Sequence, residues 1–182
     1  MDYPNSTSLT KVLIIDADAA MREHVADYLK NTGYNTVTAS DGEAGLAMIQ
    51  SESPGCVLCD LNLPKVDGIS VLQLISNEDA ELPIIVISGE GEMTDVVEAL
   101  RLGASDFLIK PIVDLEVLEH SIERSLKYLY QKNQLGGLIS LGALINLPIF
   151  FLALRKNKIP FAAGIVCISL LVVVVVALLK IN

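Results

Sequence analysis

Short runs of apolar residues alternate with amphipathic stretches from Lys11 to about Gln131. Three of the runs consist only of aliphatic residues or cysteine, a pattern typical of strands that are buried on both faces of a sheet. The runs predict five strands, at residues 12–15, 35–39, 56–59, 84–87 and 107–109. After each run, apolar residues recur at helical spacing, as in Met21, Val25 and Leu29. We therefore expect a helix after every strand.

A strand followed by a helix, repeated along the chain, is the pattern of a parallel sheet with helices on both faces. Crossovers between parallel strands are right-handed. We therefore expect a five-stranded doubly wound α/β domain over residues 11–131. Residues 1–10 are polar and lack the basic and apolar regions of a signal peptide, so we expect a flexible leader there.

The pattern changes after residue 131. Residues 137–154 and 161–179 contain no charged side chain and are mostly aliphatic. As helices, the two segments would reach roughly 27–29 Å, close to the ~30 Å hydrocarbon core of a bilayer. We therefore expect a membrane region over residues 132–182 that forms a transmembrane helical hairpin. Pro148 lies in the first segment, so a kinked span and a re-entrant loop both remain open there.

The distribution of charge separates the same two regions. The chain of 182 residues has 22 acidic and 13 basic side chains, for a net charge of −9. Every acid lies at or before Glu123, and the four bases beyond Lys132 stand in a tail without acids. Nonspecific binding to nucleic acid needs clustered Lys and Arg. The acidic domain has no such cluster, so we expect no nucleic-acid partner.

The cysteines and histidines do not indicate a redox or metal site. Cys56 and Cys59 have the C-x-x-C spacing of some redox and metal sites. They fall within one predicted strand, where side chains three residues apart point to opposite faces. We therefore expect two buried core thiols. His24 and His120 have no partner at metal-ligand spacing, so we expect them at surface or half-buried positions of helices.

Polar side chains stand where the predicted strands end: Asp16 and Asp18, Asp60, Ser88 and Lys110. The carboxyl ends of parallel strands share one edge of a sheet, and ligands bind there. Clustered carboxylates repel one another unless a cation holds them, and oxygen donors of this kind suit Mg²⁺. A carboxylate beside Mg²⁺ and a lysine can attack a phosphoryl group. The strand ends thus favour a phosphoryl-transfer site.

From about Lys11 to Leu129, the chain resembles the receiver domain of two-component response regulators, which has a flavodoxin-like fold. The resemblance rests on five pieces in order along the chain. They are residues 12–18 (VLIIDAD), 60–64 (DLNLP) followed by Asp67-Gly68, 87–89 (ISG), 102–104 (LGA) and 106–111 (DFLIKP).

The resemblance implies a role for each matching residue. Asp60 would be the phosphoacceptor, and the catalytic and switch residues would be Lys110, Ser88 and Phe107. The Mg²⁺ ligands would be Asp16, Asp60 and the backbone carbonyl of Asn62, with Asp18 as a further candidate. Asn62 and Glu90 hold the positions that tune hydrolysis of the acyl phosphate. The bond between Lys110 and Pro111 would be cis.

One position departs from the family pattern. The family usually has two adjacent acids after the first strand, and the second acid is a direct metal ligand. Here that position is Ala17. Because Mg²⁺ tolerates replacement of one carboxylate by water, we expect a weakened metal site. Asp18 could also turn toward the metal or hold one of its waters.

Together these features predict a membrane-anchored receiver in a two-component phosphorelay. Its partners would be a sensor histidine kinase or phosphotransfer protein, the lipid membrane and an unknown downstream protein. It would lie at the inner (cytoplasmic) membrane with the receiver in the cytoplasm. We expect no enzymatic activity beyond self-catalysed phosphotransfer and dephosphorylation. Two alternatives remain open: a pseudo-receiver adaptor that is not phosphorylated because of Ala17, and a phosphate sink without output.

Overall fold

The computed structural model describes residues 10–79, 81–89 and 93–133. The chain divides into two compact units, Met1–Leu129 and Tyr130–Asn182, and the fold below is that of the first. The predicted spans at 137–154 and 161–179 and most of the predicted leader lie outside the described residues. Among the described residues, no helix has the length and hydropathy needed to cross a membrane.

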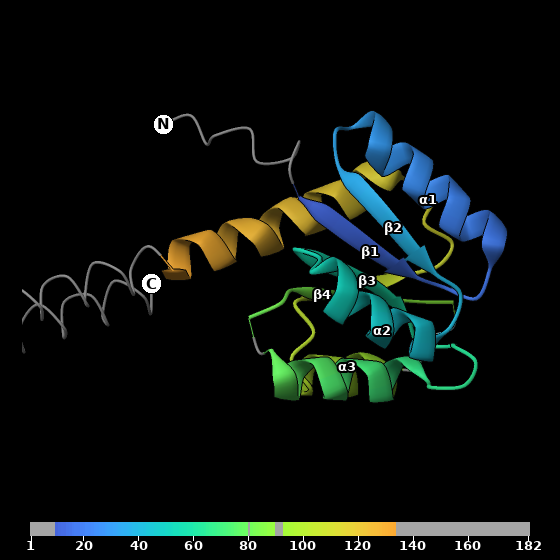
Figure 1. Cartoon of the computed structure of the whole chain (residues 1–182), viewed down its shortest axis with the longest axis vertical. Helices are drawn as coiled ribbons and strands as arrows, with labels where there is room; N and C mark the ends of the chain where they lie inside the picture. The colour runs from blue at the N-terminus through green and yellow to red at the C-terminus, as the bar shows by residue number, and fades with distance from the viewer. Residues whose placement is uncertain (1–9, 80, 90–92, 134–182) are drawn as a thin grey trace, which may run out of the picture. The chain divides into compact units, whose positions relative to one another are not determined.

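Five parallel strands form one sheet in the order β2-β1-β3-β4-β5 (Figure 1). Their bounds are β1 (Lys11–Ile15), β2 (Asn35–Ala39), β3 (Cys56–Asp60), β4 (Ile84–Ser88) and β5 (Asp106–Ile109). This confirms the predicted flavodoxin-like, five-stranded doubly wound α/β fold. The strand order reverses at β1, because β2 lies on one side of it and β3 on the other. Doubly wound folds bind their ligands at this point.

Helices follow the strands as predicted. They are α1 (Ala19–Asn31), α2 (Gly42–Glu52), α3 (Gly68–Glu78), α4 (Met93–Arg101) and a last helix that begins at residue 115 and is described to residue 133. An aspartate caps each of the first three helices by accepting hydrogen bonds from backbone N–H groups of the first turn. The three caps are Asp18, Asp41 and Asp67.

The core consists of two apolar clusters, one on each face of the sheet. One cluster joins Val12, Ile14 and Leu58 of the strands to side chains of α1 and the last helix. The other joins Leu13 and Val57 to side chains of α3 and α4. Since neighbouring residues of one strand belong to different clusters, both faces of the sheet are covered. The central strands β1, β3 and β4 are accordingly apolar over most of their length.

Cys56 and Cys59 follow this alternation. Cys56 belongs to the cluster of α1 and Cys59 to the cluster of α3, and both thiols are free and fully buried. Burial raises the pKa of Cys56 to about 12 and also raises that of Cys59. The thiols therefore stay protonated and face apart, which confirms the prediction of two core cysteines.

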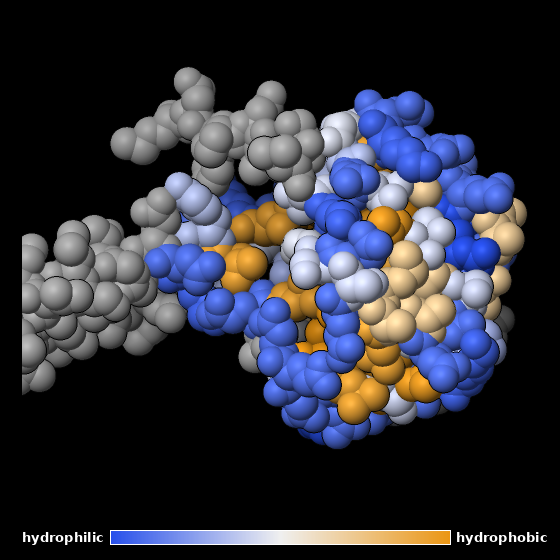
Figure 2. All heavy atoms as spheres, in the orientation of Figure 1, coloured by the Kyte–Doolittle hydropathy of each residue, from blue (hydrophilic) through white to orange (hydrophobic). Residues whose placement is uncertain are grey.

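Apolar side chains also gather over α2 and α3 on the face seen in Figure 2. There Leu46, Ile49, Leu74 and Ile75 line most of a cleft of about 170 Å³. None of the predicted site residues lines this cleft, so it is separate from the polar strand ends.

Candidate functional site

The polar residues predicted at the strand ends lie at the carboxyl edge of the sheet. Asp60 is the last residue of β3, and Ser88 is the last residue of β4. Asp16 and Lys110 directly follow β1 and β5. Asp16, Asp60 and Ser88 are buried, with 4%, 6% and 2% of their surface exposed. The edge therefore carries a cluster of largely buried polar side chains at the point where the strand order reverses.

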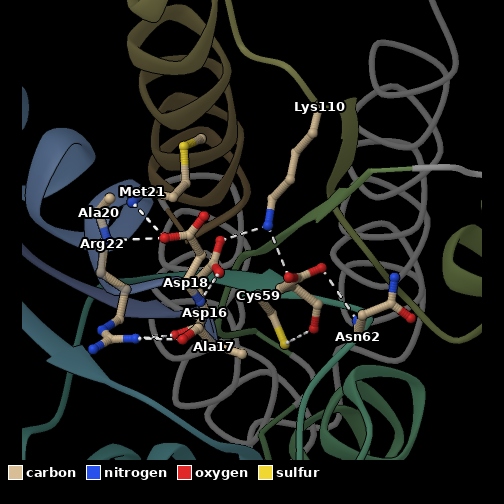
Figure 3. A network of polar contacts seen from close by, with 10 residues as sticks. Asp16, Ala17, Asp18, Ala20, Met21, Arg22, Cys59, Asn62 and Lys110 are labelled. Atoms are coloured by element: carbon tan, nitrogen blue, oxygen red, sulfur yellow. Dashed lines mark hydrogen bonds and ion pairs between the residues drawn. The ribbon is translucent and has the colours of Figure 1, made fainter.

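Lys110 contacts both buried carboxylates of this cluster (Figure 3). Its Nζ lies 2.6 Å from Asp16 Oδ2 and 2.8 Å from Asp60 Oδ2. Burial alone would lower the pKa of the Lys110 ammonium, but the hydrogen bonds and charges of the two carboxylates raise it above its ordinary value. Lys110 is therefore a charged donor at neutral pH, held by side chains far apart in the sequence.

The second oxygen of each carboxylate is fixed in the same way. Asp16 Oδ1 accepts a hydrogen bond of 2.8 Å from the N–H of Asp18, and Asp60 Oδ1 accepts one of 3.2 Å from the N–H of Asn62. In both cases the donor lies two residues after the aspartate, which is the geometry of an Asx turn. Each carboxylate is thus held between its own backbone and Lys110.

Gly68 lets the chain pass close behind Asp60. A Cβ atom at Gly68 would lie 2.1 Å from the carbonyl oxygen of Asp60 and 2.6 Å from the Cα of Leu61. Because both contacts are to backbone, any larger residue would have to move the segment that carries Asp60. Gly68 therefore allows the start of α3 to lie against the backbone that carries the Asp60 carboxylate.

The donor set fits a divalent cation that is bound through two carboxylates. Asp16 and Asp60 bring two negative charges and Lys110 one positive charge, so these three side chains leave one negative charge. Mg²⁺ is often bound by one or two carboxylates together with waters. Within residues 10–79, 81–89 and 93–133, no three Asp, Glu, His or Cys side chains form a metal-binding group. Ala17 offers only its backbone.

Asp18 faces the first turn of α1 in this structure. Its Oδ1 accepts hydrogen bonds from the N–H groups of Ala20 at 2.9 Å and Met21 at 3.3 Å (Figure 3). The carboxylate is thus engaged as a helix cap. Its part in holding a metal stays a prediction.

The remaining candidate residues have different surroundings. The carbonyl of Ser88 accepts a hydrogen bond of 2.7 Å from the N–H of Lys110, which joins the ends of β4 and β5. Phe107 is half-buried against the cluster that α3 and α4 cover. The Lys110–Pro111 bond is cis, as the resemblance implied. Glu90 lies outside the described residues.

Sequence reasoning missed the contacts of two polar residues, Arg22 beside the site and Asp106 at the opposite end of β5. Arg22 donates through Nη1 to the carbonyl oxygens of Asp16 at 2.6 Å and Ala17 at 3.1 Å. Asp106, at the start of β5, accepts from the hydroxyl of Ser121 and from Arg124 of the last helix. A signal for Arg22 was available: it is a cation in the first turn of a helix, where the helix dipole disfavours positive charge.

Residues 12–123 match the family described as response regulator receiver domain. A probable transcriptional regulator, ycf27, from Guillardia theta is 36% identical over 82% of this chain and 58% of its own length. The regulator of RpoS from Escherichia coli K12 is 32% identical over 62% of this chain and 33% of its own length. The chain thus spans between a third and three fifths of the length of these two relatives.

Solved structures have the same fold as the first unit. A CheY-like receiver domain protein from Methanospirillum hungatei has a TM-score of 0.66 at 27% identity, over 69% of this chain and 99% of that chain. The receiver domain of NtrX from Brucella abortus has a TM-score of 0.61 at 36% identity, over 64% of this chain and 98% of that chain. Both neighbours are covered almost completely, so the likeness extends over a whole receiver domain.

Proposed function

The chain belongs to the response regulator receiver family, and from that premise we propose that it is a membrane-anchored receiver that takes a phosphoryl group onto Asp60. The donor would be a sensor histidine kinase or a phosphotransfer protein of a two-component phosphorelay. The observation that carries this proposal is the contact of Lys110 with both Asp16 and Asp60, at 2.6 and 2.8 Å. A nucleophilic carboxylate and a cation that can neutralise phosphoryl oxygens lie side by side.

In the proposed reaction, a carboxylate oxygen of Asp60 attacks the phosphorus atom of the donor. The bond from phosphorus to the donor's imidazole nitrogen breaks, and a bond to the Asp60 oxygen forms, so that an acyl phosphate results. Lys110 has three N–H donors, and Asp16 and Asp60 engage two of them. The third can bind an oxygen of the transferred phosphoryl group and neutralise part of its charge.

Asp16, Asp60 and the carbonyl of Asn62 are the groups that would hold Mg²⁺, whose charge would further stabilise the phosphoryl oxygens. The buried hydroxyl of Ser88, at the end of the neighbouring strand, would donate to a phosphoryl oxygen. In the register of β4 with β5, Ser88 pairs with Ile109 and Phe107 pairs with Val86. A shift of Ser88 would therefore act on the end of β5, the strand that carries Phe107.

The downstream protein would bind the face formed by α4, β5 and the start of the last helix. Five large apolar side chains are exposed there: Val97, Leu100, Ile109, Val113 and Val117, from 42% to 90%. Exposed apolar side chains that gather on one face are typical of protein-binding surfaces. Movement of Phe107 in β5 would alter this face, so phosphorylation of Asp60 would change partner binding.

Labelling with a small phosphodonor tests the proposal. The full chain with Mg²⁺ and acetyl phosphate should gain one phosphoryl group, which mass spectrometry detects, and chelation of Mg²⁺ should prevent the gain. Asp60→Asn keeps the size of the side chain and removes the nucleophile, so this variant should stay unlabelled. A label that persists on Asp60→Asn would refute the assignment of the acceptor.

A pseudo-receiver adaptor is the second candidate, because Ala17 offers no carboxylate and Asp18 caps α1. Such an adaptor would gain no phosphoryl group in the labelling experiment and would bind its partner equally with and without phosphodonor. A phosphate sink would be labelled, yet its partner binding would not change. Comparison of the proteins that co-purify from membranes with and without phosphodonor separates these outcomes.

The membrane anchor rests on the two uncharged segments at 137–154 and 161–179. We place the protein at the inner (cytoplasmic) membrane with the receiver in the cytoplasm, where a kinase can reach it. If both segments span, a reporter fused after Asn182 stays in the cytoplasm. Activity of a reporter that works only outside the cytoplasm would refute the two-span hairpin and favour a re-entrant first segment.

A further inference from the structure

Arg22 reaches back from α1 to the end of β1 (Figure 3). Its Nη1 donates to two successive carbonyl oxygens, those of Asp16 at 2.6 Å and Ala17 at 3.1 Å. The side chain is half-buried, although it stands in the first turn of a helix where the dipole disfavours a cation. The two carbonyls, which attract positive charge, account for its position.

These hydrogen bonds hold the backbone of Asp16, whose carboxylate is one of the two that contact Lys110. The N–H of Asp16 donates to the carbonyl of Ala39 at 3.2 Å, and its carboxylate is held by Asp18 and Lys110. Arg22 holds the remaining polar group, the carbonyl. Without Arg22, the peptide groups on either side of Ala17 lose the donor that fixes their orientation. Rotation there would turn the Asp16 carboxylate away from Lys110.

We propose that Arg22 is a positioning residue that holds Asp16 and Ala17 so that the Asp16 carboxylate stays beside Asp60. The inference rests on the proposed function, in which Asp16 and Asp60 together hold the cation. The position of Asp16 matters more here than in a site with three acids. Because residue 17 is alanine, only two carboxylates, those of Asp16 and Asp60, are left to bind the cation. Displacement of a reacting group by about 1 Å can lower the rate of a reaction about a hundredfold, so the position of Asp16 beside Asp60 matters for phosphoryl transfer.

Three substitutions separate positioning from the effect of charge. Arg22→Ala removes the donors and the charge, Arg22→Gln removes the charge but keeps an N–H donor, and Arg22→Lys keeps both. Lys30→Ala is the matched control, because it removes one positive charge from the same helix at a side chain that is 56% exposed. If Arg22 acts through its hydrogen bonds, Arg22→Lys and Arg22→Gln should both retain part of its effect.

The first measurement is hydrogen exchange of the full chain without metal or phosphate. The N–H of Asp18 reports on Asp16 directly, because it donates to the Asp16 carboxylate. Arg22→Ala should speed its exchange by about tenfold or more, and Arg22→Lys by less. Amides inside β3 and β4 should exchange as in the wild type. Equal acceleration across the sheet, or none at Asp18, would overturn the inference.

The second measurement is the affinity for Mg²⁺, titrated calorimetrically into the same full-length variants. Arg22→Ala should weaken binding by about tenfold, Arg22→Gln by less, and Lys30→Ala should leave it unchanged. Tighter binding in both Arg22→Ala and Arg22→Gln would show that Arg22 only repels the cation, and would overturn the inference.

If the wild type binds no Mg²⁺ or takes no phosphoryl group, the proposed function fails. The exchange of the Asp18 amide still decides the role of Arg22, because that measurement needs neither metal nor phosphate.

Discussion

Substitution of Lys110 by methionine tests whether this lysine stabilises the two buried carboxylates of the site. The ammonium lies within 2.8 Å of an oxygen of each carboxylate, and the side chains of Asp16 and Asp60 are only 6% and 8% exposed. Methionine keeps a similar length but brings no charge. Two buried carboxylates would then face each other without a cation, and like charges at short range destabilise the folded state.

The expected loss of stability in Lys110→Met depends on how deeply its ion pairs are buried. Removal of one partner from a buried ion pair costs about 3–5 kcal/mol, because the remaining charge is left unpaired. Lys110 is 20% exposed, so water compensates part of that loss, and we expect the lower end, about 3 kcal/mol.

Pulse proteolysis of the full chain across a urea series measures the folded fraction of each variant. Lys110→Met with Asp60→Asn leaves one carboxylate, so the double variant should be more stable than Lys110→Met alone. Lys65→Met is the matched control. Lys65 also contacts two acids, Asp41 at 2.9 Å and Glu43 at 3.4 Å, but it is 56% exposed. Exposed pairs contribute little, so its loss should be much smaller.

The reasoning fails if Lys110→Met costs no more than Lys65→Met. It also fails if removal of the Asp60 charge makes Lys110→Met less stable, since the two carboxylates would then not be in conflict.

Three further experiments test residues in and around the site. Ala17→Asp should tighten Mg²⁺ binding, because it adds a carboxylate to a divalent site; a titration with unchanged or weaker affinity would contradict this. Gly68→Ala should lower the free energy of unfolding, measured in urea, by about 3 kcal/mol, because the new Cβ would lie 2.1 Å from the Asp60 carbonyl oxygen. Gly89→Ala is the control: its Cβ would lie 4.0 Å from the nearest atom, so its stability should hardly change. The difference in stability between wild type and Lys110→Met should persist up to pH 10.5, the ordinary pKa of lysine. It should disappear as the pH rises through the raised pKa of Lys110 in the folded state, and urea unfolding between pH 9 and 12 measures it.

The fold could be predicted because strands that are buried on both faces of a sheet appear in the sequence as continuous apolar runs. The strand Ile84–Ser88 is apolar up to Ile87, and all five of its residues are buried. The polar side chains of the site stand at the end of such an apolar run or directly after it, so the pattern also located the site. The opposite orientations of Cys56 and Cys59 followed from strand geometry alone and are confirmed.

The contacts of Arg22 and Asp106 could not be predicted in this way. Both depend on where long side chains reach after the elements have packed. Arg22 turns back to β1, and Asp106 contacts a helix whose residues are 15 and 18 positions further along the chain. A hydrophobic pattern fixes which face of an element is buried. It does not fix the hydrogen bonds that side chains at the border of that face will make.

Asp18 shows why one aspartate can be read in two ways from the sequence. An acid two residues after a strand and just before a helix suits both a metal site and a helix cap. In the structure the capping bonds to Ala20 and Met21 are formed. Rotation of the carboxylate toward a metal would break them, and loss of a cap costs about 0.5–2 kcal/mol. A metal held by Asp16 and Asp60 with additional waters avoids that cost. With Ala17 beside Asp16, a bound cation would therefore depend on the two carboxylates that Lys110 already contacts.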